Sequence, residues 1–121
     1  MTIGEFSKKS EISCSTLRYY ENKGLISVKR DAANRRVYSE NDIEWAKFLQ
    51  RLKNTGMSLK NMKLYSDLRY QGEATMQERL KLLCEHRKYV DKQMQLWQEY
   101  SDNLSKKIFF YENEIRKQQS T

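Results

Sequence analysis

The chain has 121 residues and a mass of 14.6 kDa, which is enough for one domain with a short appendage. No run of 18 apolar residues occurs, and the N-terminus lacks the basic start and apolar stretch of a secretory signal. The only two cysteines, Cys14 and Cys84, have no paired spacing. This excludes a disulfide framework and a zinc knuckle, and it predicts a cytoplasmic protein in a reducing compartment.

The positive charge is concentrated in the first part of the chain. Residues 1–70 carry 14 Lys and Arg against 8 Asp and Glu, whereas the remaining residues carry 9 and 8, for a formal net charge of +7. Such a bias favours a polyanionic partner, because binding releases condensed counterions. Many small proteins are mildly basic, however, so charge alone leaves the partner open.

Helix-start signals recur along the chain. Residues 2–5, 39–42 and 75–78 fit capping boxes, and Ser13 and Ser58 can act as simple N-caps. Gly24, Gly56 and Gly72 each follow a helical stretch, where a left-handed residue often ends a helix. These signals predict helices near residues 3–9, 13–23, 40–55, 58–70 and 75–117.

Between Gly24 and Ser39 the pattern changes to short β-type runs. Residues 25–28 and 36–38 flank a polar turn at 31–34, which predicts a hairpin. The predicted fold class is therefore mainly α: a winged helix-turn-helix of four helices plus a short β-hairpin wing, followed by a long dimerisation helix forming a coiled coil. The corresponding domains are 1–72, the coiled-coil helix 75–117 and a tail at 118–121.

The last predicted helix carries a strict heptad pattern. From Met76 to Ile115 the seam positions alternate in steps of four and three residues, and only Arg87 and Ser101 among them are not apolar or aromatic. A helix of some forty residues spans about 60 Å, and the rest of the chain could cover one end at most. We therefore expect a homodimer, whose orientation does not follow from the repeat. Its predicted seam comprises Leu80, Leu83, Val90, Met94, Trp97, Leu104, Ile108 and Tyr111.

The second predicted helix has the groups that DNA recognition needs. Leu17 and Tyr20 can share an inward face, while another side presents a hydroxyl, a guanidinium, a phenol and an amide, which suit phosphates and base edges. Thr16 lies near the helix start, where a recognition helix enters the groove. The exposed set is Ser15, Arg18, Tyr19 and Asn22.

Simpler roles exist for two of these residues. Tyr19 could pack on its own domain, and Arg18 could pair on the surface with Glu21 or Asn22. A surface pair would not explain the run of polar groups around Arg18.

The predicted wing is densely basic. Four cationic residues occur within eight positions, offset only by Asp31: Lys29, Arg30, Arg35 and Arg36. Beside a helix-turn-helix such a hairpin favours a phosphate clamp or an arm toward the minor groove, although a merely solvated loop is the simpler alternative.

Six strings of residues occur in an order that resembles a known family. They are Ile3–Glu5, Ser15–Glu21, Gly24–Ile26, Asn34–Tyr38, Asp42–Ile43 and Thr55–Leu59. Together they resemble the winged-helix DNA-binding domain of the MerR (mercury-resistance regulator) family of bacterial transcription factors. The resemblance implies a dimer held by an antiparallel coiled coil. It also implies a palindromic promoter operator with an over-long spacer, which the dimer bends and untwists for RNA polymerase.

The resemblance also implies roles for individual residues. Arg18 and Tyr19 would contact the DNA from the recognition helix, Arg36 and Tyr38 fall on an R-x-Y wing motif, and Lys60 falls at a further phosphate contact. Residues 48–83 look most like regulators of aldehyde and thiol stress. Several members of that group carry a cysteine where this chain has Arg51.

The other functional expectations concern sensing and chemistry. Cys84 has Arg87 and Lys88 on its helix side and is a candidate sensor thiol, although a role as a small hydrophobe is commoner. His86, two residues from Cys84, points elsewhere, so no metal site and no cofactor are expected. No nucleophile–base pair or phosphate loop suggests an enzyme. The alternative to a DNA-binding regulator is a coiled-coil interaction module whose basic head binds RNA or a protein partner.

Overall fold

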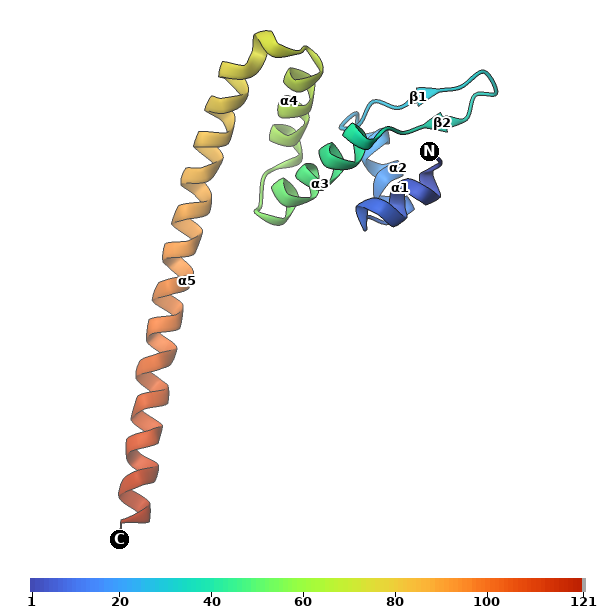
Figure 1. Cartoon of the computed structure of the whole chain (residues 1–121). Coiled ribbons are helices and arrows are strands. Elements are labelled where there is room, and N and C mark those ends of the chain that lie inside the picture. The colour runs from blue at the N-terminus through green and yellow to red at the C-terminus, as the bar shows by residue number, and fades with distance from the viewer. Residues whose placement is uncertain (121) are drawn as a thin grey trace. The chain divides into compact units, whose positions relative to one another are not determined.

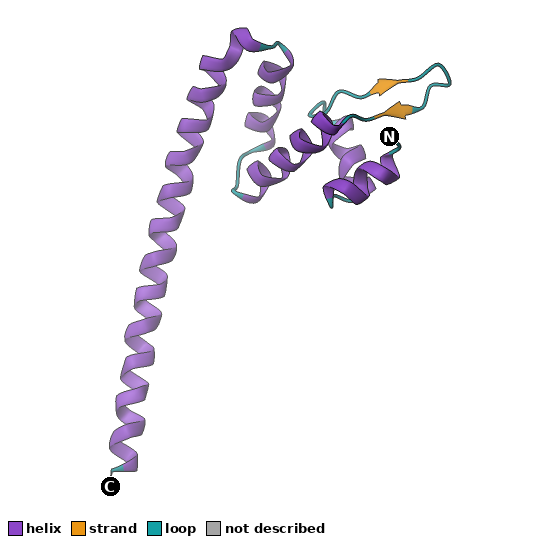
Figure 2. Ribbon diagram, viewed as in Figure 1, coloured by secondary structure: helices purple, strands orange, loops and turns teal. Residues whose placement is uncertain are grey.

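The computed structural model describes residues 1–120 and divides into two units, Met1–Leu83 and a second unit from Cys84 onward. The elements follow one another as predicted, with helices dominating (Figures 1 and 2). Their order is α1 (Ile3–Ser10), α2 (Cys14–Asn22), β1 (Lys29–Arg30), β2 (Arg36–Val37), α3 (Glu40–Asn54), α4 (Leu59–Tyr70), the 3₁₀ turn η1 (Glu73–Thr75) and α5 (Met76–Gln119). None of the described helices is both long and apolar enough to span a membrane.

The local helix-start signals are largely confirmed. Ser13 and Ser58 accept hydrogen bonds from backbone amides in the first turns of α2 and α4, and Ser39 forms a complete capping box with Asp42. Gly24 and Gly56 have φ values of 73° and 87°, so each supplies the left-handed residue that the sequence required. Helix α1 ends close to the predicted position, but the left-handed residue that follows it is Glu11, with φ 61°, and not a glycine.

The capping box predicted at residues 75–78 is wrong. The Thr75 hydroxyl donates to the carbonyl oxygens of Leu68 (2.5 Å) and Gly72 (2.9 Å), so it ties the end of α4 to η1 instead of capping α5. A side chain that is 5 % exposed satisfies its polar group where a carbonyl is within reach.

The first strand of the hairpin was also placed too early. Leu25 and Ile26, predicted as strand, lie in the core, and β1 begins only at Lys29. The Leu25 carbonyl accepts from Trp45 Nε1 (2.9 Å) and from the buried Ser66 hydroxyl (2.7 Å), so it is not available to a strand partner. Core packing therefore overrides the β-type composition of residues 25–28.

The first unit has a single hydrophobic core built from α1 to α4. Phe6, Leu17, Leu25 and Leu49 are essentially inaccessible to solvent. Burying a Leu or Phe side chain stabilises a fold by about 1.5–3 kcal/mol. The Trp45 ring stacks on Tyr65 at a centroid distance of 5.7 Å and lies under the Arg69 guanidinium at 4.3 Å. This core includes the inward face of α2 and the residues on both flanks of the hairpin.

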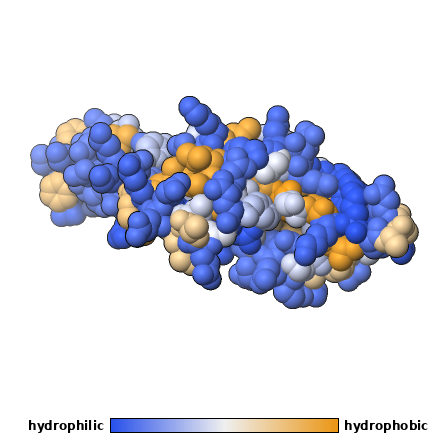
Figure 3. Space-filling model, turned by 90° about the horizontal axis from the view of Figure 1, so that it is seen from above, coloured by the Kyte–Doolittle hydropathy of each residue, from blue (hydrophilic) through white to orange (hydrophobic). Residues whose placement is uncertain are grey.

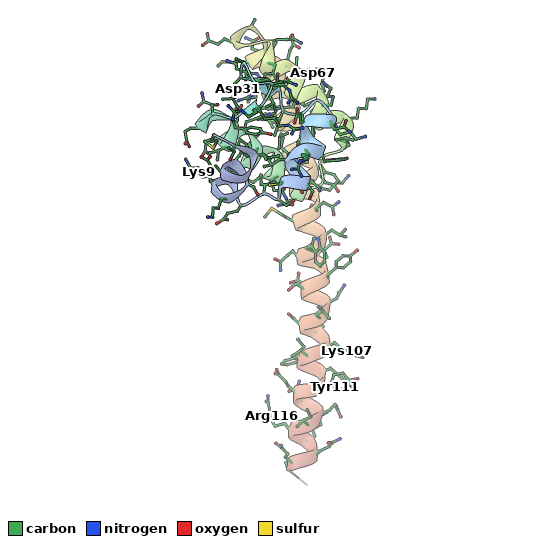
Figure 4. All side chains as sticks on the ribbon, turned by 90° about the vertical axis from the view of Figure 1, so that its right-hand side faces the viewer. Lys9, Asp31, Asp67, Lys107, Tyr111 and Arg116 are labelled. Carbon is green, nitrogen blue, oxygen red and sulfur yellow. The ribbon has the colours of Figure 1, made fainter. Side chains whose placement is uncertain are left out.

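Helix α5 is continuous over 44 residues, and no residue within its described length is buried. Most of its apolar heptad positions are exposed, with Met94, Trp97 and Leu104 each about two-thirds exposed. Leu83 and Val90 are partly buried, and Leu83 packs against the core of the first unit. In Figure 4, Lys107 and Tyr111 project from the same side of the helix, and Arg116 projects from the other. The helix therefore presents an apolar stripe that one copy of the chain does not cover.

Candidate DNA-binding surface

Helix α2 is amphipathic in the way the sequence predicted. Leu17 and Tyr20 are buried at 1 % exposure, and the Tyr20 hydroxyl donates to Gln50 Oε1 at 2.6 Å. The opposite side consists of exposed residues, namely Ser15, Arg18, Tyr19 and Asn22. Tyr19 is 43 % exposed, with Lys23 Nζ 5.7 Å from its ring centroid, so its ring is not packed inside its own domain.

The start of α2 is organised by a small hydroxyl network. Ser13 Oγ donates to Thr16 Oγ1 at 2.9 Å and lies 3.1 Å from Ser15 Oγ. Ser13 also accepts from the Thr16 amide, which caps the helix. These contacts fix the two hydroxyls of the predicted recognition residues in defined positions.

A groove of about 450 Å³ lies beside the start of α2. Its lining combines hydroxyls with apolar side chains: Ser15, Thr16, Tyr19, Lys53, Met57, Leu59 and Met62. Elsewhere, the surface seen from above is mostly hydrophilic, with separate hydrophobic patches (Figure 3). The exposed face of α2 thus borders a concave surface with one cationic side chain.

The hairpin that follows α2 carries the predicted basic residues. β1 and β2 pair antiparallel, with Arg30 opposite Arg36. At the tip, Asp31 Oδ1 accepts from the amides of Ala33 and Arg35, and Arg35 Nε lies 3.1 Å from Asp31 Oδ2. Lys29 is exposed. The wing is therefore an ordered turn and not a loose loop.

Glu21 connects α2 to the wing. Its Oε2 accepts from Arg36 Nε at 2.6 Å and its Oε1 lies 3.4 Å from Arg30 Nη2. The sequence had suggested Glu21 as a surface partner of Arg18. Within residues 1–120, however, Arg18 forms no ion pair. The contact between α2 and the wing was missed because it joins residues up to 15 positions apart.

Tyr38 is the predicted contact that does not lie on the surface. Its ring is 4 % exposed and packs on Phe6 at a centroid distance of 4.5 Å, which makes it a core residue. Its buried hydroxyl has no hydrogen-bond partner in the described structure. Burial raises the pKa of Tyr38 above its usual value of 10.0; Glu21 raises it further, and nearby Arg36, Arg18 and Arg30 oppose the rise. An unpaired hydroxyl therefore sits where α2 and wing arginines converge.

Lys60 is exposed in the first turn of α4, as predicted, and it makes no ion pair within the described part of the chain. Its neighbour Lys63 is already engaged, with Nζ 2.6 Å from Asp67 Oδ1 and 3.3 Å from the Gly24 carbonyl oxygen. Of these two lysines, Lys60 is thus the one left available to a phosphate.

The two cysteines differ in accessibility. Cys84 is exposed on α5, whereas Cys14 is partly buried, with its thiol 3.9 Å from the Ile3 carbonyl oxygen. Across residues 1–120, no group of three or more His, Cys, Asp or Glu side chains could hold a metal ion.

Taken together, these features define a class of protein. A helix whose polar face is exposed, supported by a helical core and flanked by a basic two-stranded hairpin, is a winged helix-turn-helix domain of the kind that binds DNA.

Comparison with known proteins identifies the family. Residues 1–68 match the model of the MerR HTH family of regulatory proteins, and residues 43–106 match the model described as MerR, DNA binding. The chain belongs to the MerR family of DNA-binding transcriptional regulators.

Individual relatives cover most of the chain. An uncharacterised HTH-type transcriptional regulator of Haemophilus influenzae is 38 % identical over 112 residues, which are 92 % of this chain and 83 % of the relative. The crystal structure of HiNmlR, a MerR family regulator lacking the sensor domain and bound to promoter DNA, is 38 % identical. It has a TM-score of 0.80 and covers 93 % of this chain and 90 % of that one. A MerR family regulator from Bacillus thuringiensis is 28 % identical, with a TM-score of 0.76 over 89 % of this chain and 96 % of its own.

Proposed function

We propose that this chain acts as a homodimer that binds a two-fold-symmetric promoter operator and changes transcription by distorting the DNA between its half-sites. The observation that carries the proposal is the junction of α2 and the wing, where exposed recognition residues and guanidinium groups surround one unpaired hydroxyl. The similarity to HiNmlR, which was crystallised on promoter DNA, supports the same type of partner. An adaptor with a basic head that binds RNA or protein is not favoured.

The residues of α2 would read the operator. Ser15, Thr16 and Asn22 offer hydroxyls and an amide to base edges, and Arg18 and Tyr19 offer a guanidinium and a phenol to a base or a phosphate. Because Arg18 has no ionic partner in the described residues, no protein contact has to break before it reaches DNA.

Residues of the wing and of α4 would bind the phosphates of the DNA backbone. Lys29, Arg30, Arg35 and Arg36 supply cationic groups for phosphates, and Lys60 adds a charge at the start of α4. Tyr38 would take part only through its hydroxyl, because its ring belongs to the core. Because this hydroxyl is buried, a phosphate oxygen would become its acceptor only after the side chains that cover it move aside.

The stripe on α5 would form the dimer. A 44-residue helix is about 66 Å long, so antiparallel pairing would place the two α5 starts near opposite ends of the coiled coil. Half-sites on one side of B-DNA are separated by multiples of about 34–36 Å, and two turns match that length. A dimer that grips both half-sites can then bend and untwist the spacer, which makes DNA deformability part of specificity. RNA polymerase would recognise the corrected promoter.

A regulator of this kind would work in the cytoplasm, where its promoter is. Of the two thiols, we propose Cys84 as the one on which an electrophile would act, because it is exposed whereas Cys14 is partly buried. No catalytic step is proposed.

The proposal is tested by selecting bound sequences from a random duplex pool with the purified chain and then measuring affinities by gel shift at several salt concentrations. We expect enrichment of an inverted repeat. Arg18→Ala should weaken binding to the selected duplex about tenfold, a loss typical of one phosphate or base contact. Arg51→Ala is the matched control, since it removes the same charge from an exposed site on α3 outside the proposed surface.

Different outcomes would contradict the proposed α2 surface and the proposed dimer. If no sequence is enriched, or if Arg18→Ala and Arg51→Ala weaken binding equally, the proposed surface is wrong. If the enriched site has no two-fold symmetry, the dimeric arrangement is wrong while α2 readout stands.

A further inference from the structure

Glu21 places a carboxylate at the junction of α2 and the wing, where the neighbouring charged side chains are arginines. Its side chain is 21 % exposed and contacts Arg36 and Arg30, both of which belong to the wing. A carboxylate repels DNA phosphates, so its presence at this point lowers the affinity for any duplex. We therefore expect Glu21 to make a contribution to DNA binding that offsets this loss of affinity.

The two ends of the hairpin are anchored, because Tyr38 is a core residue, Val28 packs against the core and the Ser27 amide donates to the Tyr70 hydroxyl at 3.0 Å, but the paired strands themselves bury little. Each strand has only two residues, and three of these four residues are exposed. Isolated two-stranded hairpins are marginally stable in water. Arg30 and Arg36 also face each other directly across the ladder, where like charges are destabilising.

The two carboxylate oxygens of Glu21 attach both strands of the wing to α2 and offset the repulsion between Arg30 and Arg36. One oxygen binds Arg36 through Nε and the other binds Arg30 through Nη2, while Arg30 Nη1 donates to the Asn34 carbonyl oxygen at 3.2 Å. Within the described residues, the two terminal nitrogens of Arg36 make no hydrogen bond. The planar guanidinium is thereby held by one edge, and its terminal edge remains able to donate to a phosphate.

We propose that Glu21 is a positioning residue for specific DNA binding: it fixes the wing arginines relative to α2, so that it lowers affinity for random DNA and raises discrimination in favour of the operator. The inference rests on the proposed DNA-binding function. Holding Arg36 and Arg30 in one geometry reduces the ordering that binding requires. That gain applies only where phosphates and base contacts are in register with α2, which is the case at an operator.

The test compares the full-length chain with Glu21→Gln, using the duplex selected from the random pool and a random duplex of equal length. The matched control is Glu44→Gln, which changes the charge equally at an exposed carboxylate without an ion pair in the described structure. For Glu21→Gln we expect about threefold tighter binding to random DNA and about threefold weaker binding to the selected duplex, so the ratio falls about tenfold. The salt dependence on random DNA should steepen by about one phosphate contact, or 0.9 in slope.

Glu21→Asp separates geometry from charge. It keeps the carboxylate but is one methylene too short to reach both arginines, so discrimination should fall while random-duplex affinity stays within about twofold of wild type. The proposal is overturned if either variant keeps the wild-type ratio, or if both variants unfold, since Glu21 would then be required for the fold. A wild-type chain that does not discriminate would instead contradict the proposed function.

Discussion

The two regions of the molecule are stabilised in opposite ways. The first unit, Met1–Leu83, buries its apolar side chains in a core shared by four helices, whereas α5 has no buried residue in its described length. Apolar side chains are as necessary to one as to the other, but only the first unit satisfies them within a single chain. The first unit, or head, therefore needs no second copy to bury its apolar side chains, whereas α5 does.

The most direct test of this difference is to place a charge in the apolar stripe of α5. Leu104→Lys should turn the dimer into a monomer, because each copy would bury an unpaired ammonium group. We expect dimerisation to weaken by at least about 100-fold, or 3 kcal/mol, as measured by sedimentation equilibrium. Gln95→Lys, which adds the same charge outside the seam, should leave the dimer intact. Equal effects of the two substitutions would show that this stripe is not the interface.

A cavity in the core of the head should lower the stability of the head and leave the dimer intact. Leu49→Ala removes a fully buried side chain and should lower the free energy of unfolding of the head by about 3 kcal/mol. The change can be followed by denaturant titration, using the fluorescence of Trp45 in a Trp97→Phe background. Leu64→Ala, at a side chain on α4 that is 46 % exposed, is the control and should cost much less. Loss of the dimer in Leu49→Ala before the head unfolds would contradict the independence of the two regions.

Tyr38→Phe tests the unpaired hydroxyl of the head. Removing a buried polar group without a partner should leave stability unchanged or raise it by up to about 1 kcal/mol at neutral pH, while DNA binding weakens a few-fold. The pKa of Tyr38 is raised by burial, so the folded state binds the proton more tightly than the unfolded state does. Its contribution to stability is complete below the unfolded pKa of 10.0 and is lost as the pH rises through the folded pKa.

Urea titrations at neutral pH and above pH 10.0 measure both effects, and Tyr38→Phe should flatten the alkaline loss of stability. Tyr20→Phe is the comparison, because its hydroxyl is hydrogen-bonded to Gln50. It should lower stability by about 1 kcal/mol and leave DNA binding unchanged. If Tyr38→Phe is as destabilising as Tyr20→Phe and binds DNA normally, the hydroxyl has no role at the DNA surface.

The smallest effect concerns the two thiols, one in each region. Cys84 should react with N-ethylmaleimide at least about tenfold faster than Cys14, since only Cys84 is exposed. Mass spectrometry of a time course measures both rates, and Cys84→Ser and Cys14→Ser assign them. Cys84→Ser should leave the dimer and DNA affinity unchanged in the absence of an electrophile. Equal reactivity would remove the reason for preferring Cys84 as the sensor.

Much of the helical framework could be predicted because its signals are local. Ser13, Ser39 and Ser58 cap helices through bonds to residues three positions ahead, and Gly24 and Gly56 end helices through their own φ. The inward face of α2 followed from the spacing of Leu17 and Tyr20 in the same way. Such features need no knowledge of the rest of the chain.

The errors occurred where a distant partner competed with a local preference. Leu25 reads as strand, but its carbonyl is bound by Trp45 and Ser66, which lie 20 and 41 positions away. Thr75 reads as a cap, but its hydroxyl bonds to Leu68 and Gly72, which precede it. In the candidate site, the pattern identified the basic wing but not the carboxylate that holds it.

By itself, the sequence determined the order of the helices, the polar face of α2, the basic hairpin and the seven-residue repeat of α5, because each depends on near neighbours or on a period. Only the tertiary structure decided that Glu21 joins the wing to α2 and that Tyr38 enters the core with its hydroxyl unpaired. The physical reason is that a side chain far along the chain competes for the same hydrogen-bonding or apolar surface. Which partner prevails depends on the distances that folding of the whole head creates.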